Sequence, residues 1–254
     1  MRTTLIFLIL SLISNILIAQ NTRFIVRAKA KDAKFIGTSL GSALILVKNV
    51  ETDEILAKGF TEGSTGNTQR IMNTPHQRFE TLSDEQTAKF ETTLALDEPT
   101  FVTIEAHSPY AKRGARVMAS TQMWLIPGKD IIGDGIVLEI PGFIIDILHP
   151  HTHRYMKKAD LKNGILNVEA NIVMMCGCII SKGGLWDGSK MEVNAILKLN
   201  GEKQGEYPLQ ITDTENLFTG DIPLTQSGNY EIILYAYDAR SGNTGVEKVN
   251  FILQ

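Results

Sequence analysis

The chain contains two cysteines, Cys176 and Cys178, with only Gly177 between them. Met174 precedes Cys176 at the same two-residue spacing. Side chains two residues apart on a strand lie on one face, so a thioether and two thiols point in the same direction. Cu(I) prefers thiolate and thioether ligands. The spacing therefore makes Met174, Cys176 and Cys178 candidate ligands of a copper-type site.

Other interpretations of the cysteine pair stay open. From Leu166 onward the even positions of this segment are apolar, and both cysteines continue that series, which is typical of the buried face of a strand. A disulfide within the chain requires a sharp bend at Gly177, because alternate Cα atoms of a strand lie about 6–7 Å apart. A disulfide between two chains is also compatible with the pattern. The bridge within one chain would be strained and therefore easily reduced, which would make the pair redox-active.

Three of the five histidines alternate in the segment "FIIDILHPHTHRYM". His149, His151 and His153 share one face of an extended chain, about 6.5–7 Å apart. A chelating pair therefore requires a turn at Pro150, and neutral imidazole suits Zn(II) or Cu(II). The alternative is a polar, solvated linker after a strand. Combined with the sulfur ligands, the histidines predict a copper or zinc site made of His149, His151, His153, Met174, Cys176 and Cys178.

Short alternating segments bounded by Gly, Pro, Asn and Asp fill most of the chain, which is typical of β-sandwiches. We expect an all-β protein with two tandem β-sandwich domains, residues 20–140 and 141–254. In the second half the pattern predicts strands at Phe143–Leu148, Ile165–Cys178, Met191–Leu199, Phe218–Leu224, Tyr230–Tyr237 and Val246–Leu253.

In the first half the pattern predicts hairpins. One turns at Glu51–Asp53, a second pairs residues 89–96 with residues 100–108, and a third turns at Gly133–Gly135, where glycine permits positive φ. Residues 61–87 are polar and predict a long loop with one short helix. Loops of this length are more often functional or mobile than inert.

The stretch "SGNYEIILYAYDARSGNTG" resembles the penultimate strand and last hairpin of bacterial immunoglobulin-like and fibronectin-type sandwiches. The resemblance covers residues 143–254 and implies a tyrosine corner, in which the hydroxyl of Tyr230 bonds back to the backbone. The family's inter-sheet cysteine is replaced by Ile232, so its disulfide is absent. More weakly, "LVKNVETDEILAKGFTEGSTGNT" resembles the opening of carboxypeptidase-regulatory-like or transthyretin-like sandwiches. These families are mostly binding, spacing or adhesive modules.

Three loops of the second half are candidate partner-binding segments: residues 149–164, 179–188 and 238–245. Trp186 and Asp187 in the second loop, and Arg240 and Asn243 in the third, are the candidate contact residues. A tryptophan in such a loop either stacks on a sugar or covers the end of a sandwich. The expected partner is a protein, a glycan or another component of the cell envelope.

The first 19 residues predict a cleaved signal peptide, because Arg2 precedes a mostly apolar run from Leu5 to Ile18 and Ala19 ends a plausible cleavage site. The run is too short to span a bilayer comfortably. We therefore expect a secreted or periplasmic protein that is not an integral membrane protein. The formal net charge of −3 gives no basic surface for nucleic acid.

Common catalytic signatures are missing from the sequence: it has no G-x-S-x-G, H-E-x-x-H or Walker A motif. We therefore expect a non-catalytic binding module without a resident cofactor. Two alternatives remain: an extracytoplasmic protein that binds or delivers a metal such as copper, and a redox protein that uses Cys176 and Cys178.

Overall fold

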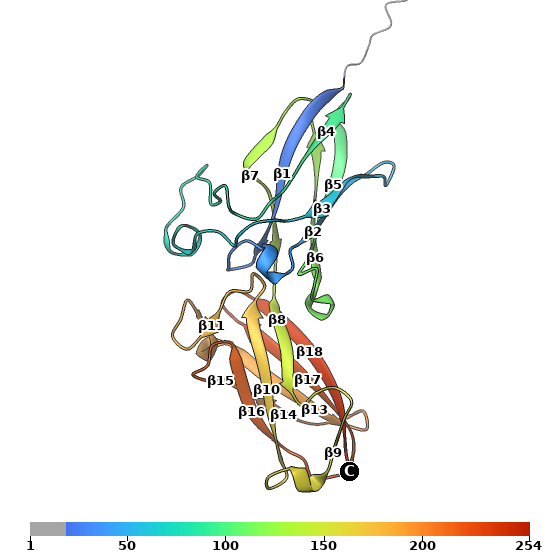
Figure 1. Cartoon of the computed structure of the whole chain (residues 1–254), viewed down its shortest axis with the longest axis vertical. Coiled ribbons are helices and arrows are strands. Elements are labelled where there is room, and N and C mark those ends of the chain that lie inside the picture. Colours follow the sequence, from blue (N-terminus) through green and yellow to red (C-terminus); the bar gives the residue numbers. More distant parts are fainter. Residues whose placement is uncertain (1–18) are drawn as a thin grey trace, which may run out of the picture.

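The computed structural model describes residues 19–254, which form two β-sandwiches arranged end to end (Figure 1). The prediction of an all-β chain of tandem sandwiches is confirmed. Every hydrogen-bonded strand pair in this part of the chain joins strands of the same half, and Pro141 and Gly142 connect the halves. The domain bounds 20–140 and 141–254 stay predictions. The signal peptide lies almost wholly outside the described residues, within which no helix is long and apolar enough to cross a membrane.

The first sandwich packs a three-stranded sheet, in the order β4-β1-β7, against a four-stranded sheet in the order β3-β2-β5-β6. Its core lies between the two sheets and includes Phe24, Ile45 and Ile104, which are fully buried. The strands are β1 (Gln20–Ala30), β2 (Leu44–Asn49), β3 (Ile55–Phe60), β4 (Phe90–Leu96), β5 (Thr100–Ser108), β6 (Val117–Leu125) and β7 (Ile131–Ile140).

The second sandwich packs the sheet β15-β16-β10-β8 against the sheet β14-β13-β17-β18-β9. Apart from β9, which extends the second sheet, this is the strand arrangement of an immunoglobulin sandwich. The strands are β8 (Phe143–His149), β9 (Arg154–Met156), β10 (Ile165–Met174), β11 (Ile180–Ser181), β12 (Trp186–Asp187), β13 (Glu192–Leu199), β14 (Glu202–Pro208), β15 (Gln210–Ile211), β16 (Leu217–Pro223), β17 (Gly228–Asp238) and β18 (Asn243–Leu253).

The tyrosine corner implied by the resemblance is present. Tyr230 is 3% exposed, and its hydroxyl donates a hydrogen bond of 2.8 Å to the backbone oxygen of Gln226. Its ring stacks on Phe251 of the neighbouring strand β18, with the ring centroids 5.3 Å apart. This contact fixes the start of β17 against β18.

Two of the predicted hairpins are wrong. Strands β4 and β5 are consecutive but lie in opposite sheets, where β4 pairs with β1 while β5 pairs with β2 and β6. Gly133 and Gly135 do have positive φ, yet they form a bulge inside the continuous strand β7, which pairs in parallel with β1. A bulge, like a tight turn, needs residues that tolerate positive φ.

The predicted long loop is present and contains one short π-helical turn, Gln69–Asn73. Two polar residues hold its end against the first sandwich. Asp134, in the β7 bulge, accepts hydrogen bonds from the backbone amides of Leu82 and Ser83. Arg27 is 3% exposed and donates to the backbone oxygens of Thr87 and Ala88. The remaining short helical turns are Thr38–Leu40, Arg113–Ala115, Lys158–Asp160 and Gly188–Lys190.

Candidate functional site at the junction

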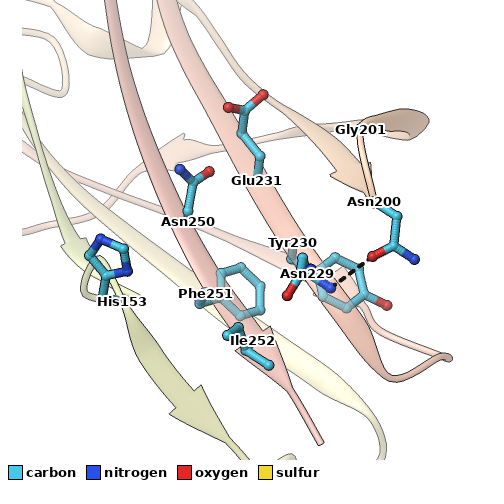
Figure 2. Close-up of a pocket in the computed structure, with 9 residues that line it drawn as sticks. All are labelled: His153, Asn200, Gly201, Asn229, Tyr230, Glu231, Asn250, Phe251 and Ile252. Carbon is cyan, nitrogen blue, oxygen red and sulfur yellow. Dashed lines mark hydrogen bonds between the residues drawn. The ribbon is translucent and has the colours of Figure 1, made fainter.

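The three candidate histidines lie at the end of the second sandwich that is remote from the first. His149 ends β8, and its Nδ1 is 2.6 Å from the backbone oxygen of Asn167. His151 is exposed. The backbone amide of His153 donates to the backbone oxygen of Asn250 at 2.7 Å. His153 and Asn250 both line a pocket beside β18 (Figure 2). The histidines therefore cap the far end of the sandwich.

The cysteines lie at the opposite end of the same sheet. Strand β10 pairs with β8 so that Glu169 faces His149 and Met174 faces Phe143. Met174, the last residue of β10, is five residues beyond Glu169, a separation of about 16–17 Å along the strand, and Cys176 lies beyond it. The combined metal site of histidine and sulfur ligands is thus not formed. Among residues 19–254, no group of three or more His, Cys, Asp or Glu side chains is placed to hold a metal ion.

Cys176 and Cys178 form a disulfide with each other, and their Cα atoms are 5.4 Å apart. The chain bends at Gly177, where φ is +76°. The expected alternation also holds, because every even position from Leu166 to Cys178 is buried. The pair is therefore a disulfide inside the apolar end of the strand. A bridged sulfur offers no thiolate for Cu(I), so Met174 lacks the partners that the metal interpretation requires.

Thiol titration checks the disulfide. We expect no reactive thiol in the native or the unfolded protein, and two thiols after reduction and unfolding. The bridge closes a very short loop, so replacing both cysteines by serine should lower the free energy of unfolding by only about 1–2 kcal/mol. The double-serine variant, with no thiol under any condition, is the control. A thiol that reacts in the unfolded, unreduced protein would contradict the assignment.

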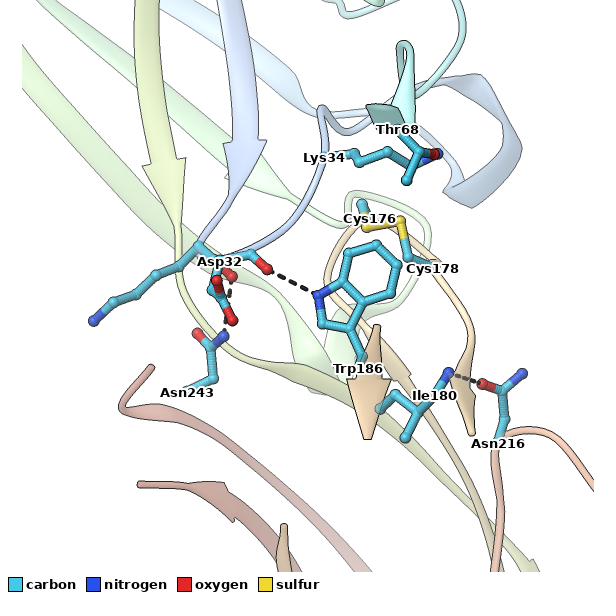
Figure 3. The surroundings of a disulfide bond; sticks show 10 residues. Asp32, Lys34, Thr68, Cys176, Cys178, Ile180, Trp186, Asn216 and Asn243 are labelled. Carbon is cyan, nitrogen blue, oxygen red and sulfur yellow. Dashed lines mark hydrogen bonds between the residues drawn. A yellow bond between two sulfur atoms is a disulfide. The ribbon is translucent and has the colours of Figure 1, made fainter. Parts of the chain in front are cut away.

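Trp186 points from β12 into the junction between the sandwiches, beside the disulfide (Figure 3). Its side chain is 7% exposed, and its indole Nε1–H donates to the backbone oxygen of Asp32 at 2.8 Å. Asp187 is also buried, and it accepts bonds from the Ser189 hydroxyl and the Gly183 amide. These hydrogen bonds hold the pKa of Asp187 well below its usual range. Trp186 is therefore engaged at the junction and Asp187 within its own loop, and partner binding by either residue stays a prediction.

Asn243 is likewise buried at the junction. Figure 3 shows its side chain beside the Asp32 segment, where its Nδ2 donates to the backbone oxygen of Lys31. Its Oδ1 accepts a hydrogen bond from the backbone amide of Gly142. It thereby links the first sandwich, the connection and the second sandwich. Of the four candidate partner-binding residues, only Arg240 is exposed, and its Nε donates to Asp238 at 3.3 Å. Trp186, Asp187 and Asn243 are thus engaged within the chain.

The three candidate loops do not form one surface. Residues 179–188 and 238–245 meet the first sandwich, whereas residues 149–164 lie at the far end (Figure 1). An ion pair between Lys112 and Asp146, at 2.6 Å, adds a further contact between the halves. Several independent polar contacts therefore hold the two sandwiches against each other.

A groove of about 540 Å³ opens beside this junction. The disulfide and Trp186 form part of its wall. Ile179 and Leu185, which are 49% and 47% exposed, offer aliphatic surface to a ligand. Across the groove, Lys34 donates to the hydroxyl of Thr68 at 3.0 Å, and burial lowers the pKa of this lysine. Thr65 and Thr68 belong to the long loop, so that loop forms one side of the groove.

Sequence reasoning missed the first-sandwich side of this groove. Lys34, Thr65 and Thr68 follow no motif, and only the folded chain brings them beside Leu185. Leu185 did carry a signal, because an apolar residue between two glycines and a tryptophan is unusual for a solvated loop. The polar residues of the far-end pocket were also missed, although Asn229 and Glu231 take the outward positions of an alternating strand.

No protein-family model and no curated protein matches the chain. Among solved structures, the chain is similar to fibronectin(III)-like modules of CbhA from Clostridium thermocellum, at 12% identity and a TM-score of 0.29, over 92% of this chain and 94% of that chain. Another is a chimeric titin Z1Z2 that carries a decorin peptide, at 9% identity and a TM-score of 0.23, over 93% and 96%. A third is a D1–D4 ectodomain fragment of ICAM-5, at 10% identity and a TM-score of 0.26, over 93% of this chain and 50% of that chain. These similarities are too low to assign a function.

Proposed function

We propose that the protein is a non-catalytic interaction module that holds a peptide segment of a partner protein in the groove between its sandwiches. The observation that carries this proposal is the pair Ile179 and Leu185. Both are about half exposed at the rim of a groove whose other walls are already fixed. Apolar side chains at the edge of a preformed, partly polar groove are typical of binding sites.

The groove favours a peptide over a glycan. In the described part of the chain, no side-chain amide lines the groove to match the adjacent hydroxyls of a sugar, and the ring of Trp186 is buried with its N–H bonded to Asp32. The accessible apolar surface is aliphatic, which suits the side chains of a peptide. Thr65, Ser181 and Lys34 add hydroxyl and ammonium groups that can bond to a peptide backbone.

We also propose that the protein works outside the cytoplasm. The signal-peptide pattern of the first 19 residues supports this location. The Cys176–Cys178 disulfide agrees with it, because disulfides persist in oxidising compartments. Metal binding or redox chemistry at the reduced cysteines stays a prediction, as does the resemblance of the first sandwich to carboxypeptidase-regulatory-like and transthyretin-like sandwiches.

Selection of displayed peptides against the full chain tests the groove. We expect enriched peptides whose affinity falls at least tenfold in Leu185→Asp, because burying one leucine side chain contributes about 1.5–3 kcal/mol. Ile165→Asp is the matched control, since Ile165 is 40% exposed at the remote end of β10. Peptides that bind equally well to the Leu185→Asp and Ile179→Asp variants would refute the proposal, as would glycan binding at the groove without any peptide binding.

A further inference from the structure

A second pocket of about 540 Å³ lies at the far end of the second sandwich (Figure 2). It is built on the outward face of β17 and β18, where Glu231 is paired with Asn250 and Asn229 with Ile252. Asn200, from the turn between β13 and β14, closes one side. His153 closes the other side.

Besides His153, the polar side chains that line this pocket have similar planar end groups. Asn200, Asn229 and Asn250 contribute amides and Glu231 contributes a carboxylate, all planar groups with two hydrogen-bonding atoms side by side. A hydroxyl group both donates and accepts, so adjacent hydroxyls of a sugar match amides and carboxylates in a way that a simple cation or anion does not. Figure 2 draws a hydrogen bond between two of these residues: the backbone amide of Asn229 donates to Oδ1 of Asn200 at 3.1 Å.

The charge of the pocket favours an uncharged ligand. Glu231 is the one acidic residue that lines it, and Lys198 lies 3.1 Å from this carboxylate. The pair leaves little net charge to attract an ion but keeps a strong hydrogen-bond acceptor in place. An anionic ligand would meet the carboxylate of Glu231 directly.

The floor of the pocket is the outer surface of two paired strands. Ile252 offers aliphatic surface there, whereas the stacked rings of Tyr230 and Phe251 lie on the buried face of the sheet and hold the two strands in place from below. A sugar ring has hydroxyls at its rim and C–H groups on its faces, and therefore needs this combination of polar edge and apolar floor. A rigid floor also spares the ligand the cost of ordering the site.

We propose that this pocket binds a neutral saccharide. The proposal is independent of the junction groove, which is lined by different residues at the other end of the sandwich. Glu231 and Asn250 would bond to adjacent hydroxyls, and Ile252 would contact a face of the sugar ring.

NMR titration of the full, isotope-labelled chain tests the proposal, with cellotriose, chitotriose and lactose as probes and glucuronic acid as the anionic counterpart. We expect at least one neutral probe to shift the amide signals of residues 153, 200–201, 229–231 and 250–252. Glu231→Gln should weaken this binding about tenfold, because a bond to a charged acceptor is stronger than one to a neutral acceptor. Asn250→Ala should also weaken it, and Glu202→Gln, at the neighbouring turn, should not.

Three results would overturn the proposal. One is the absence of a shift at these residues with every neutral probe at millimolar concentration. Another is binding of glucuronic acid at this pocket that equals or exceeds binding of the neutral probes. The last is saccharide binding that Glu231→Gln and Asn250→Ala both leave unchanged, while the dispersion of their spectra shows that these variants are folded.

Discussion

Trp186→Ala is expected to lower the free energy of unfolding by about 3–5 kcal/mol, the usual cost of truncating a buried tryptophan. The side chain is 7% exposed and fills the contact between the sandwiches. Its removal also leaves the backbone oxygen of Asp32 without the indole N–H. Because the lost contact joins the two halves, we further expect them to move independently, which small-angle scattering would detect as a more extended average shape.

The chain offers its own control, since its other tryptophan, Trp124, is 53% exposed on the outer face of the first sandwich. Trp124→Ala should lower the free energy of unfolding by only about 1 kcal/mol, because the contact it loses is the half-exposed ring pair with Phe101. Trp186→Phe should give an intermediate loss, because it keeps most of the packing and removes the hydrogen bond. Denaturant unfolding of the three variants measures the series. Equal losses for Trp186→Ala and Trp124→Ala would contradict a structural role for Trp186 at the junction.

Much of the fold follows from local pattern. The alternation from Leu166 to Cys178 predicts the buried face of β10 residue by residue, because a strand has only two faces and one of them must be apolar. The tyrosine corner follows from a resemblance whose quoted residues lie in the last two strands, around Tyr230. Each feature depends on residues close together in the chain, for which the sequence carries enough information.

Pairing between strands was harder to predict. Strands β4 and β5 are separated by three residues, and a hairpin was the natural expectation, yet the chain crosses between the sheets there. The choice depends on which distant strands are available as neighbours, here β1 for β4 and β2 for β5. Gly133 and Gly135 likewise indicate backbone with positive φ, but the sequence does not distinguish a turn from a bulge.

The candidate site was predicted in its parts but not in its arrangement. Trp186 and the cysteines do lie together, and Trp186 does cover the end of a sandwich, one of the two roles expected for it. Trp186 is bonded to Asp32 of the other sandwich. These two residues are 154 positions apart, and the hydrophobic periodicity of the sequence does not indicate contacts over such a separation. For the same reason, alternation alone predicts one site from the histidines and the cysteines, whereas His149 pairs with Glu169 in the middle of β10 and the cysteines lie beyond its last residue.

Arg27→Met is expected to release the loop of residues 61–87 and to lower the free energy of unfolding by about 2–4 kcal/mol. Arg27 lies almost fully buried on β1, and its Nη1 donates to the backbone oxygens of Thr87 and Ala88 at 2.5 and 2.8 Å. Both of those residues are about 1% exposed, so methionine would leave two buried carbonyl groups without a donor. Each unsatisfied buried group costs about 1–3 kcal/mol. Burial lowers the pKa of Arg27, while the nearby carboxylates of Asp134, Asp84 and Glu91 raise it.

Amide hydrogen exchange shows which segments of the chain lose protection in this variant. In Arg27→Met we expect faster amide exchange across residues 61–88, with little change in β10 and β17 of the second sandwich. Arg23→Met is the matched control, because Arg23 lies on the same face of β1 but its side chain is 52% exposed in an ion pair with Glu91, a contact worth at most about 1 kcal/mol. Since Thr65 and Thr68 form one side of the junction groove, the Arg27→Met variant should also bind groove peptides more weakly while Leu185 is intact. If exchange in the loop is unchanged, Arg27 is not what holds this wall of the groove, and Asp134 becomes the residue to replace.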